Sequence, residues 1–312
     1  MIKQLRSVYK KRHYFKKGKD FLVSGTYLIN GDNFNLVKSK SEKKDAKIWN
    51  FVKIRSKKTN LNKYSDGKFV IGFYKAKFIL KDQIHFFLYK KNQYCRTEEL
   101  YKKYSSYIFF KHPVYAFDKK NFEISVPIVN GCIYDDDKHF DMFLHLLMQQ
   151  YNNERISEIR TIDSFENVPF FIQHGDCKNG NIIWENDVPT LIDLESVNSY
   201  PIFYDLFYYL LMTKGKNFAL YLNNYSHDVD AICSKLKIGN PKINNIDYFL
   251  SCYLTYLSSY ASKKYSEKVI DFYFHWITYS GLEKYPILKS KIRELSAKLA
   301  KEGFKKYECV GE

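Results

Sequence analysis

The stretch from His174 to Glu195 reads HGDCKNGNIIWENDVPTLIDLE and carries most of the information in this chain. Two short apolar runs, Ile182–Trp184 and Thr190–Leu194, are joined by the turn Glu185-Asn186-Asp187. Apolar runs of this length around a polar turn predict an antiparallel hairpin. Polar side chains flank the hairpin on both sides, so we expect the hairpin to hold them at a fixed separation.

Three of these polar side chains have the types and the order that phosphoryl transfer needs. Asn181 follows Asp176 by five residues, the Asp-to-Asn spacing of a kinase catalytic loop, and Asp193 follows after the hairpin. Phosphoryl transfer requires a carboxylate within hydrogen-bond reach of the attacking hydroxyl, and we predict that Asp176 supplies it. Transfer also requires oxygen ligands for Mg²⁺, which the Asn181 amide and the Asp193 carboxylate can provide.

A third motif, Tyr204-Asp205-Leu206, opens an apolar helix further along the chain. An Asp at the start of a helix can cap the helix. We expect Asp205 to do so and also to bond the backbone of the catalytic loop.

Together, HGDCKNGNIIW, LIDLE and YDL resemble the active-site signature of the aminoglycoside phosphotransferase and choline kinase branch of the protein-kinase-like superfamily. In that branch HGD replaces the HRD of protein kinases, and an I-D-[FWL]-E run replaces DFG. The resemblance covers about residues 170–210. It implies a bilobal α+β fold and ATP and Mg²⁺ as cofactors. By position it implies Asp176 as catalytic base, Asn181 and Asp193 as metal ligands, His174 and Gly175 as residues that shape the loop, Glu195 as an accessory polar residue and Asp205 as a structural acid.

The hydrophobic pattern divides the chain into three parts. Residues 1–20 form a basic tail, and residues 21–129 carry short Val-, Ile-, Phe- and Tyr-rich runs that predict an antiparallel, nucleotide-binding N-lobe. Residues 130–312 are mostly of helical period and predict a catalytic C-lobe. In the N-lobe we predict a hairpin around Lys81-Asp82-Gln83 and one helix over 97–110, with Thr97 as N-cap candidate. The C-lobe helices are predicted over 138–151, 203–213, 246–263, 267–280 and 287–302.

The nucleotide contacts of the N-lobe are less sharply defined by the sequence. Strand alternation favours Lys90, with Lys91 as the alternative, for the phosphate-binding lysine, and Glu98 or Glu99 for its acidic partner. Residues 127–132 fit an inter-lobe hinge whose backbone, at Pro127 and Val129, would bond adenine. No G-x-G-x-x-G spacing marks a glycine-rich loop, for which the rival glycines are Gly25, Gly31, Gly67 and Gly72.

Charge is distributed unevenly along the 312 residues. The formal charge is +16, but residues 1–120 hold 30 basic and 9 acidic side chains (+21), and residues 121–312 hold 20 and 25 (−5). Basic and aromatic residues are interleaved over 3–19, a composition that favours binding to an anionic membrane surface, a phosphorylated glycan or nucleic acid. A bias towards Lys, Asn, Tyr and Ile throughout the chain offers a purely compositional explanation. No RNP-like, helix-turn-helix or zinc pattern supports nucleic acid.

The six cysteines are scattered without a C-x-x-C pair, which indicates reduced thiols. With no apolar signal segment and no long apolar run, we expect a cytoplasmic protein, peripheral at the inner face of the membrane if the basic region binds there.

The charges of the two predicted lobes indicate which class of acceptor substrate to expect. A basic N-lobe favours a sugar or a cell-surface glycan precursor of the lipopolysaccharide or capsule type, and hence a role in polysaccharide biosynthesis. A mildly acidic C-lobe, with Asp135-Asp136-Asp137 near the hinge, keeps an aminoglycoside- or choline-type acceptor as the alternative. A pseudokinase or anionic-surface binding module is a second alternative, against which the presence of Asp176, Asn181 and Asp193 argues.

Overall fold

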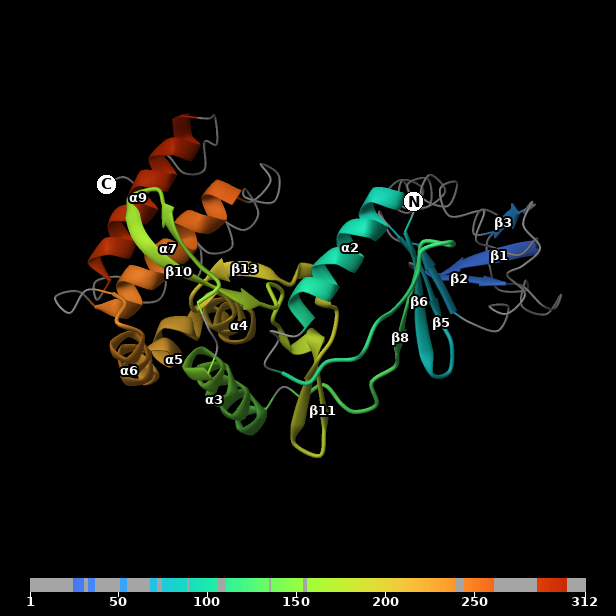
Figure 1. Cartoon of the computed structure of the whole chain (residues 1–312), viewed down its shortest axis with the longest axis horizontal. Coiled ribbons are helices and arrows are strands. Elements are labelled where there is room, and N and C mark those ends of the chain that lie inside the picture. Colours follow the sequence, from blue (N-terminus) through green and yellow to red (C-terminus); the bar gives the residue numbers. More distant parts are fainter. Residues whose placement is uncertain are drawn as a thin grey trace. The chain divides into compact units, whose positions relative to one another are not determined.

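The chain forms two compact units. The computed structural model describes residues 25–30, 33–36, 51–54, 68–71, 75–88, 90–105, 110–134, 136–153, 156–239, 244–260 and 285–301 (Figure 1). The first unit runs to residue 102 and takes in residues 113–130, and the second takes in residues 103–112 and continues from residue 131. The basic region 3–19 and the helix predicted over 267–280 lie outside the described residues, as do Gly31, Gly67 and Gly72.

An antiparallel sheet dominates the first unit. Its strand order is β3-β1-β2-β4-β5-β6-β8-β7, and the hairpin predicted around residues 81–83 is confirmed as β5 and β6. The Leu80 N–H closes its turn by donating to the Gln83 carbonyl at 2.8 Å. The strands are β1 (Gly25–Asn30), β2 (Asn33–Leu36), β3 (Phe51–Ile54), β4 (Lys68–Ile71), β5 (Lys75–Ile79), β6 (Gln83–Leu88), β7 (Ala116–Asp118) and β8 (Glu123–Pro127).

One helix, α2 (Lys91–Tyr104), follows β6 and packs Tyr94 against Leu88 and Ile124 of the sheet. The predicted start at residue 97 was wrong, because Thr97 lies within the helix, where its hydroxyl donates to the Gln93 carbonyl at 3.0 Å. A threonine hydroxyl can bond the preceding turn in this way as readily as it can cap a helix.

The second unit is mainly helical, and the helices predicted over 138–151, 203–213, 246–263 and 287–302 are confirmed within a few residues. Two further helices, α5 and α6, were not predicted, although Val229, Ile232 and Cys233 of α6 are buried at helical spacing. The helices are α3 (Asp137–Asn153), α4 (Tyr204–Lys214), α5 (Phe218–Asn224), α6 (Ser226–Leu236), α7 (Asn245–Tyr260) and α9 (Pro286–Lys301).

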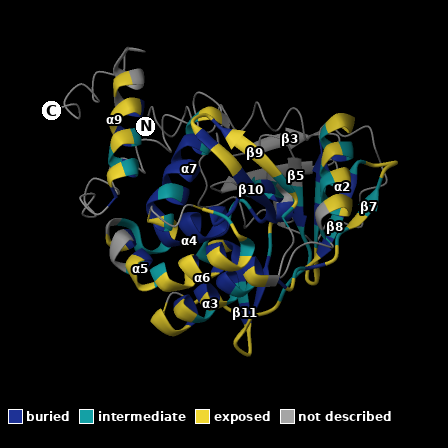
Figure 2. Ribbon diagram, turned by 60° about the vertical axis from the view of Figure 1, so that its left-hand side comes forward, coloured by how far each residue is buried: buried dark blue, intermediate teal, exposed yellow. Residues whose placement is uncertain are grey.

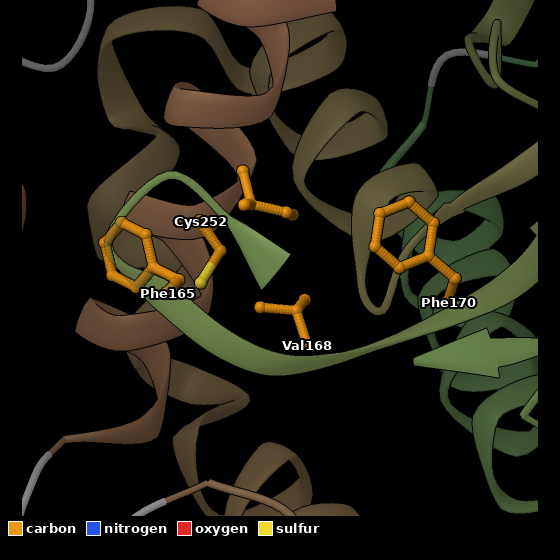
Figure 3. Close-up of a cluster of buried hydrophobic side chains, with 5 residues drawn as sticks. Phe165, Val168, Phe170 and Cys252 are labelled. Carbon is orange, nitrogen blue, oxygen red and sulfur yellow. The ribbon is translucent and has the colours of Figure 1, made fainter. Parts of the chain in front are cut away.

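A small antiparallel sheet, also not predicted, leads into the catalytic loop. It consists of β9 (Glu158–Ile162), β10 (Phe165–Gln173) and β13 (Asn198–Pro201) in the order β13-β10-β9. Consecutive residues at the end of β10 are buried, so this strand lacks the alternating pattern that marks a half-exposed strand. Figure 3 shows Phe165, Val168 and Phe170 of β10 in a buried cluster with Cys252 of α7. This cluster anchors the strand that ends immediately before His174.

The hairpin predicted between Asn181 and Asp193 is confirmed as β11 (Ile182–Glu185) and β12 (Val188–Leu191), although β12 begins and ends earlier than the predicted run 190–194. Asn186 and Asp187 both have positive φ values, 50° and 62°, as a two-residue turn that matches the twist of its strands requires.

The α+β class is confirmed, since the described residues of the first unit form mainly strands with helix α2, and those of the second unit are mainly helical. Helix α4 is buried on all sides from Tyr204 to Leu211, whereas α3 and α6 each expose one face (Figure 2). In the part of the chain that the structure describes, no helix is long and apolar enough to cross a bilayer.

Candidate active site

The predicted catalytic loop, residues 174–181, is hydrogen-bonded to the segment that joins β12 to Asp193. The His174 side chain donates from Nε2 to the Ile192 carbonyl at 2.8 Å, and its Nδ1 accepts the Asp176 N–H at 3.3 Å. These partners suit the neutral ring with its proton on Nε2. The Ile192 N–H in turn donates to the Asn181 carbonyl at 2.9 Å. Both ends of the hairpin are therefore fixed to each other.

Asp205, at the start of α4, holds the loop from the other side. Its buried carboxylate accepts the N–H of His174 at 2.7 Å and the N–H of Gly175 at 2.9 Å. Burial raises the pKa of Asp205, and the backbone hydrogen bonds from Gly175 and His174 offset part of that effect. The Asp205 carboxylate thus satisfies two backbone donors that would otherwise be buried without partners.

Gly175 occupies a position that no other residue fits without strain. Its φ is +79°, and a Cβ there would lie 2.4 Å from the Tyr200 hydroxyl oxygen and 2.6 Å from the Ser196 carbonyl oxygen. Tyr200 is itself held, because its hydroxyl donates to the Ser196 carbonyl at 2.6 Å. Glycine is therefore what allows the loop to turn tightly next to β13.

The Asp176 carboxylate accepts four hydrogen bonds. Oδ1 accepts from Tyr208 Oη at 2.7 Å and from Lys178 Nζ at 2.9 Å. Oδ2 accepts from Lys178 Nζ at 2.8 Å and from Asn181 Nδ2 at 2.9 Å. Burial acts to raise the pKa of Asp176, but the hydrogen bonds from Lys178 and Tyr208 and the Lys178 charge outweigh burial and hold the pKa below its ordinary value. The group is therefore an ionised carboxylate at neutral pH.

Asn181 and Asp193 present oxygen atoms suited to a hard cation. The Asn181 amide nitrogen is engaged by the Asp176 carbonyl at 2.8 Å, which orients the amide so that Oδ1 keeps its lone pairs. Asp193 is exposed with φ +62°, and no described residue bonds its carboxylate. Among the described residues, no group of three or more His, Cys, Asp or Glu side chains has an arrangement that could hold a metal ion. One amide and one carboxylate fit Mg²⁺, which takes its remaining ligands from water and phosphate.

The other residues predicted for the site are less informative. The Glu195 side chain lies outside what the structure describes. Lys90 is exposed in the bend after β6, and Glu98 is paired with Lys102 one turn along α2. No bond joins Lys90 to Glu98 in the described part of the chain, so their pairing stays a prediction.

The predicted hinge follows directly from β8. Pro127 is the last residue of that strand, and the Ile128 N–H donates to the Asp82 carbonyl at 2.8 Å. Within the described residues, the backbone groups of Val129 have no hydrogen-bond partner.

Besides Lys178, two further residues of the site were missed. Tyr208 touches Asp176 from α4, and the signal for it was its position three residues after Asp205, on the same helix face. Gln173 lies under the loop, where its Oε1 accepts from Tyr151 Oη at 2.7 Å and from the Asp205 N–H at 3.0 Å.

One protein-family model matches the segment that carries the site. Residues 141–231 match the model of the phosphotransferase enzyme family. The matched segment contains Asp176, Asn181 and Asp193. The resemblance predicted from the sequence is confirmed over this segment, and the match supports a phosphotransferase-type enzyme. No curated protein matches the chain in sequence.

Several solved structures are similar to the chain at low sequence identity. One is aminoglycoside phosphotransferase APH(2'')-Ib bound to ADP, with 12% identity over 69% of this chain and 93% of that chain and a TM-score of 0.42. Another is a choline/ethanolamine kinase family protein from Mesorhizobium loti, with 9% identity over 76% and 96% of the two chains and a TM-score of 0.42. The amicoumacin kinase hAmiN in complex with AMP-PNP, Ca²⁺ and Ami shares 9% identity over 88% and 96%, with a TM-score of 0.36.

Proposed function

We propose that the protein is an ATP- and Mg²⁺-dependent phosphotransferase that moves the γ-phosphate of ATP to a hydroxyl of a sugar or cell-surface glycan precursor. The observation that carries this proposal is the catalytic loop itself. Asp176 is an ionised, hydrogen-bonded carboxylate, and Asn181, oriented by a bond to the same residue, keeps its amide oxygen free. A base and a metal ligand fixed by one loop are what phosphoryl transfer requires.

In this mechanism Asp176 accepts the proton of the acceptor hydroxyl as the hydroxyl oxygen attacks the γ-phosphorus. Asn181 Oδ1 and the Asp193 carboxylate would hold Mg²⁺, which when bound neutralises charge on the phosphates. His174 and Asp205 fix the loop so that the base does not move away from its acceptor. We propose that the backbone of residues 127–129 bonds adenine, that Lys90 contacts the phosphates and that Glu98 orients Lys90.

Two observations support a neutral or anionic acceptor over a polycation. The Lys178 ammonium lies within 2.9 Å of both Asp176 oxygens, so any acceptor hydroxyl arrives beside a positive charge. The acids near residue 136 are also engaged, because Asp136 bonds His139 and Asp137 bonds Lys214. These contacts reduce the negative charge available to an aminoglycoside or choline, since each acid already faces a cation or a hydrogen-bond donor.

A cytoplasmic location and attraction of residues 3–19 to an anionic membrane surface form part of this proposal. Both rest on the charge of the sequence, and a glycan precursor carried on a lipid would be met at such a surface.

The experiment that tests the function measures ADP release from Mg-ATP by the full chain, with water alone and with acceptor panels. The panels are neutral and phosphorylated sugars on one side and kanamycin and choline on the other. We expect turnover that is stimulated by a sugar and lowered about 10²-fold or more in Asp176→Asn. If the parent protein neither binds nor turns over Mg-ATP, the proposal is wrong. Stimulation by kanamycin or choline alone would overturn only the acceptor class.

A further inference from the structure

Asp176 has no free position for a substrate proton in this structure. An ionised carboxylate offers about four lone-pair sites, and Asp176 receives four hydrogen bonds, two on each oxygen. A general base must accept the proton of the attacking hydroxyl on one of these sites. One of its three donor side chains therefore has to give way when the acceptor binds, and the other two must keep the carboxylate in place.

The burial of the donors indicates which one gives way. The Lys178 side chain is 37% exposed, and its ammonium bonds only Asp176 among the described residues. Asn181 is 7% exposed and also donates to the Asp176 carbonyl, and Tyr208 is 8% exposed. An exposed ammonium on a flexible stem regains water when it leaves, whereas a buried hydroxyl or amide would lose its bond to the carboxylate with little access to water.

Tyr208 is fixed by the helix that also fixes the loop backbone. It lies in α4 one turn after Asp205, and its ring stacks nearly parallel to that of Tyr204, with centroids 6.3 Å apart. Asp205 holds the His174 and Gly175 N–H groups, and Tyr208 holds Oδ1 of the base. One face of α4 therefore bonds both the backbone and the functional carboxylate of the loop.

We propose that Tyr208 is a positioning residue for the catalytic base, and that the acceptor hydroxyl takes the place of Lys178 on Asp176. The assignment rests on the proposed phosphotransferase function. During transfer the hydroxyl oxygen bonds to the γ-phosphorus, the bond from that phosphorus to the bridging oxygen of ADP breaks, and the hydroxyl proton passes to Asp176. Throughout, Tyr208 on Oδ1 and Asn181 on Oδ2 stop the carboxylate from rotating.

A double-mutant cycle separates this role from a merely structural one. Tyr208→Phe removes the hydroxyl and keeps the ring, and Tyr209→Phe in the same helix is the matched control, because the Tyr209 ring stacks on Phe140 and lies against Phe143 of α3. With Mg-ATP and water as the probe, we expect Tyr208→Phe to lower kcat about tenfold at unchanged KM for ATP. In the Asp176→Asn background the same change should lower kcat less than twofold, because the group that Tyr208 holds is no longer a base. Tyr209→Phe should leave kcat within twofold in both backgrounds.

The result that overturns the inference is additivity. If Tyr208→Phe lowers kcat by the same factor with Asp176 and with Asn at this position, Tyr208 acts on stability or on another group. A kcat that Tyr208→Phe leaves unchanged overturns it equally. Thermal melting of each variant identifies a folding defect, which would lower the melting temperature in both backgrounds. Absence of turnover in the parent protein overturns the proposed function itself, whereas turnover with an additive cycle overturns only the role of Tyr208.

Discussion

Asp205 accepts the N–H of Gly175 at 2.9 Å across 30 residues of sequence, and this bond joins the start of α4 to the catalytic loop. A second bond, from the His174 N–H at 2.7 Å, goes to the other carboxylate oxygen. Because both oxygens are used, the start of the helix is joined to the loop at two consecutive backbone groups. The geometry of the proposed base, Asp176, therefore depends on a residue to which the proposed mechanism gives no chemical step.

Replacing Asp205 tests this dependence. Asp205→Ala leaves two buried N–H groups without an acceptor, so we expect the free energy of unfolding to fall by about 2 kcal/mol or more. Asp205→Asn keeps one acceptor oxygen and should lie between Asp205→Ala and the parent. Urea unfolding monitored by fluorescence measures both variants. Equal stability of Asp205→Ala and the parent would show that the two bonds contribute nothing.

Two glycines in the loop make a matched pair. Gly175→Ala places a Cβ 2.4 Å from the Tyr200 hydroxyl oxygen at a φ of +79°, whereas a Cβ at Gly180 meets nothing within 4 Å. We expect Gly175→Ala to lower the free energy of unfolding by about 1–3 kcal/mol, and Gly180→Ala to change it by less than about 0.5 kcal/mol. Denaturant unfolding of the two variants side by side decides the point. A similar loss in both would mean that backbone conformation at Gly175 is not the cause.

Much of the site was visible in the sequence because the residues that compose it are close along the chain. Asp176, Asn181 and Asp193 lie within 18 residues, and the hairpin between them has a clear apolar pattern. Tyr208 was missed because its contact with Asp176 spans 32 residues and depends on how α4 packs. No local periodicity reports such a contact, and only the spacing from Asp205 hinted at it.

The fold was predictable where one face of an element is exposed. Helix α3 and the β5–β6 hairpin have the periods that partial burial imposes. Strand β10 carries Phe170, Phe171 and Ile172 in succession, all buried, and a run that is apolar on both faces has no period to detect. The start of α2 was misplaced because Thr97 has a hydroxyl that serves equally well inside a helix.

Removing the charge of Asp193 should weaken the binding of Mg²⁺. Its carboxylate and Asn181 Oδ1 are the oxygen atoms offered to Mg²⁺, so Asp193→Asn should raise the Mg²⁺ concentration for half-maximal ATP turnover by about tenfold or more, since a charged ligand is lost. Turnover at fixed ATP with increasing Mg²⁺ measures the change. Asp163→Asn, an exposed acid paired with Lys291 on another part of the second unit, is the control and should leave the curve unmoved. An unaltered requirement in Asp193→Asn would remove Asp193 from the metal site.

The turn of the β11–β12 hairpin, at Asp187, should make the stability of the protein depend on pH. His139 at the start of α3 bonds Asp136 through Nδ1 at 2.8 Å and Asp187 of the hairpin turn through Nε2 at 3.0 Å. Bonds from His139 lower the pKa of Asp136, and bonds from Lys138 and His139 lower the pKa of Asp187.

A carboxyl whose pKa is lowered by folding stabilises the folded state above its unfolded pKa of about 4, and that contribution is lost as pH falls through the folded value. We therefore expect Asp187→Asn to be less stable than the parent at pH 7 and the difference to shrink towards zero as pH falls below about 4. Urea unfolding of both proteins from pH 7 to pH 3 measures this difference, and a difference that stays constant over the whole range would show that Asp187 does not act through its charge.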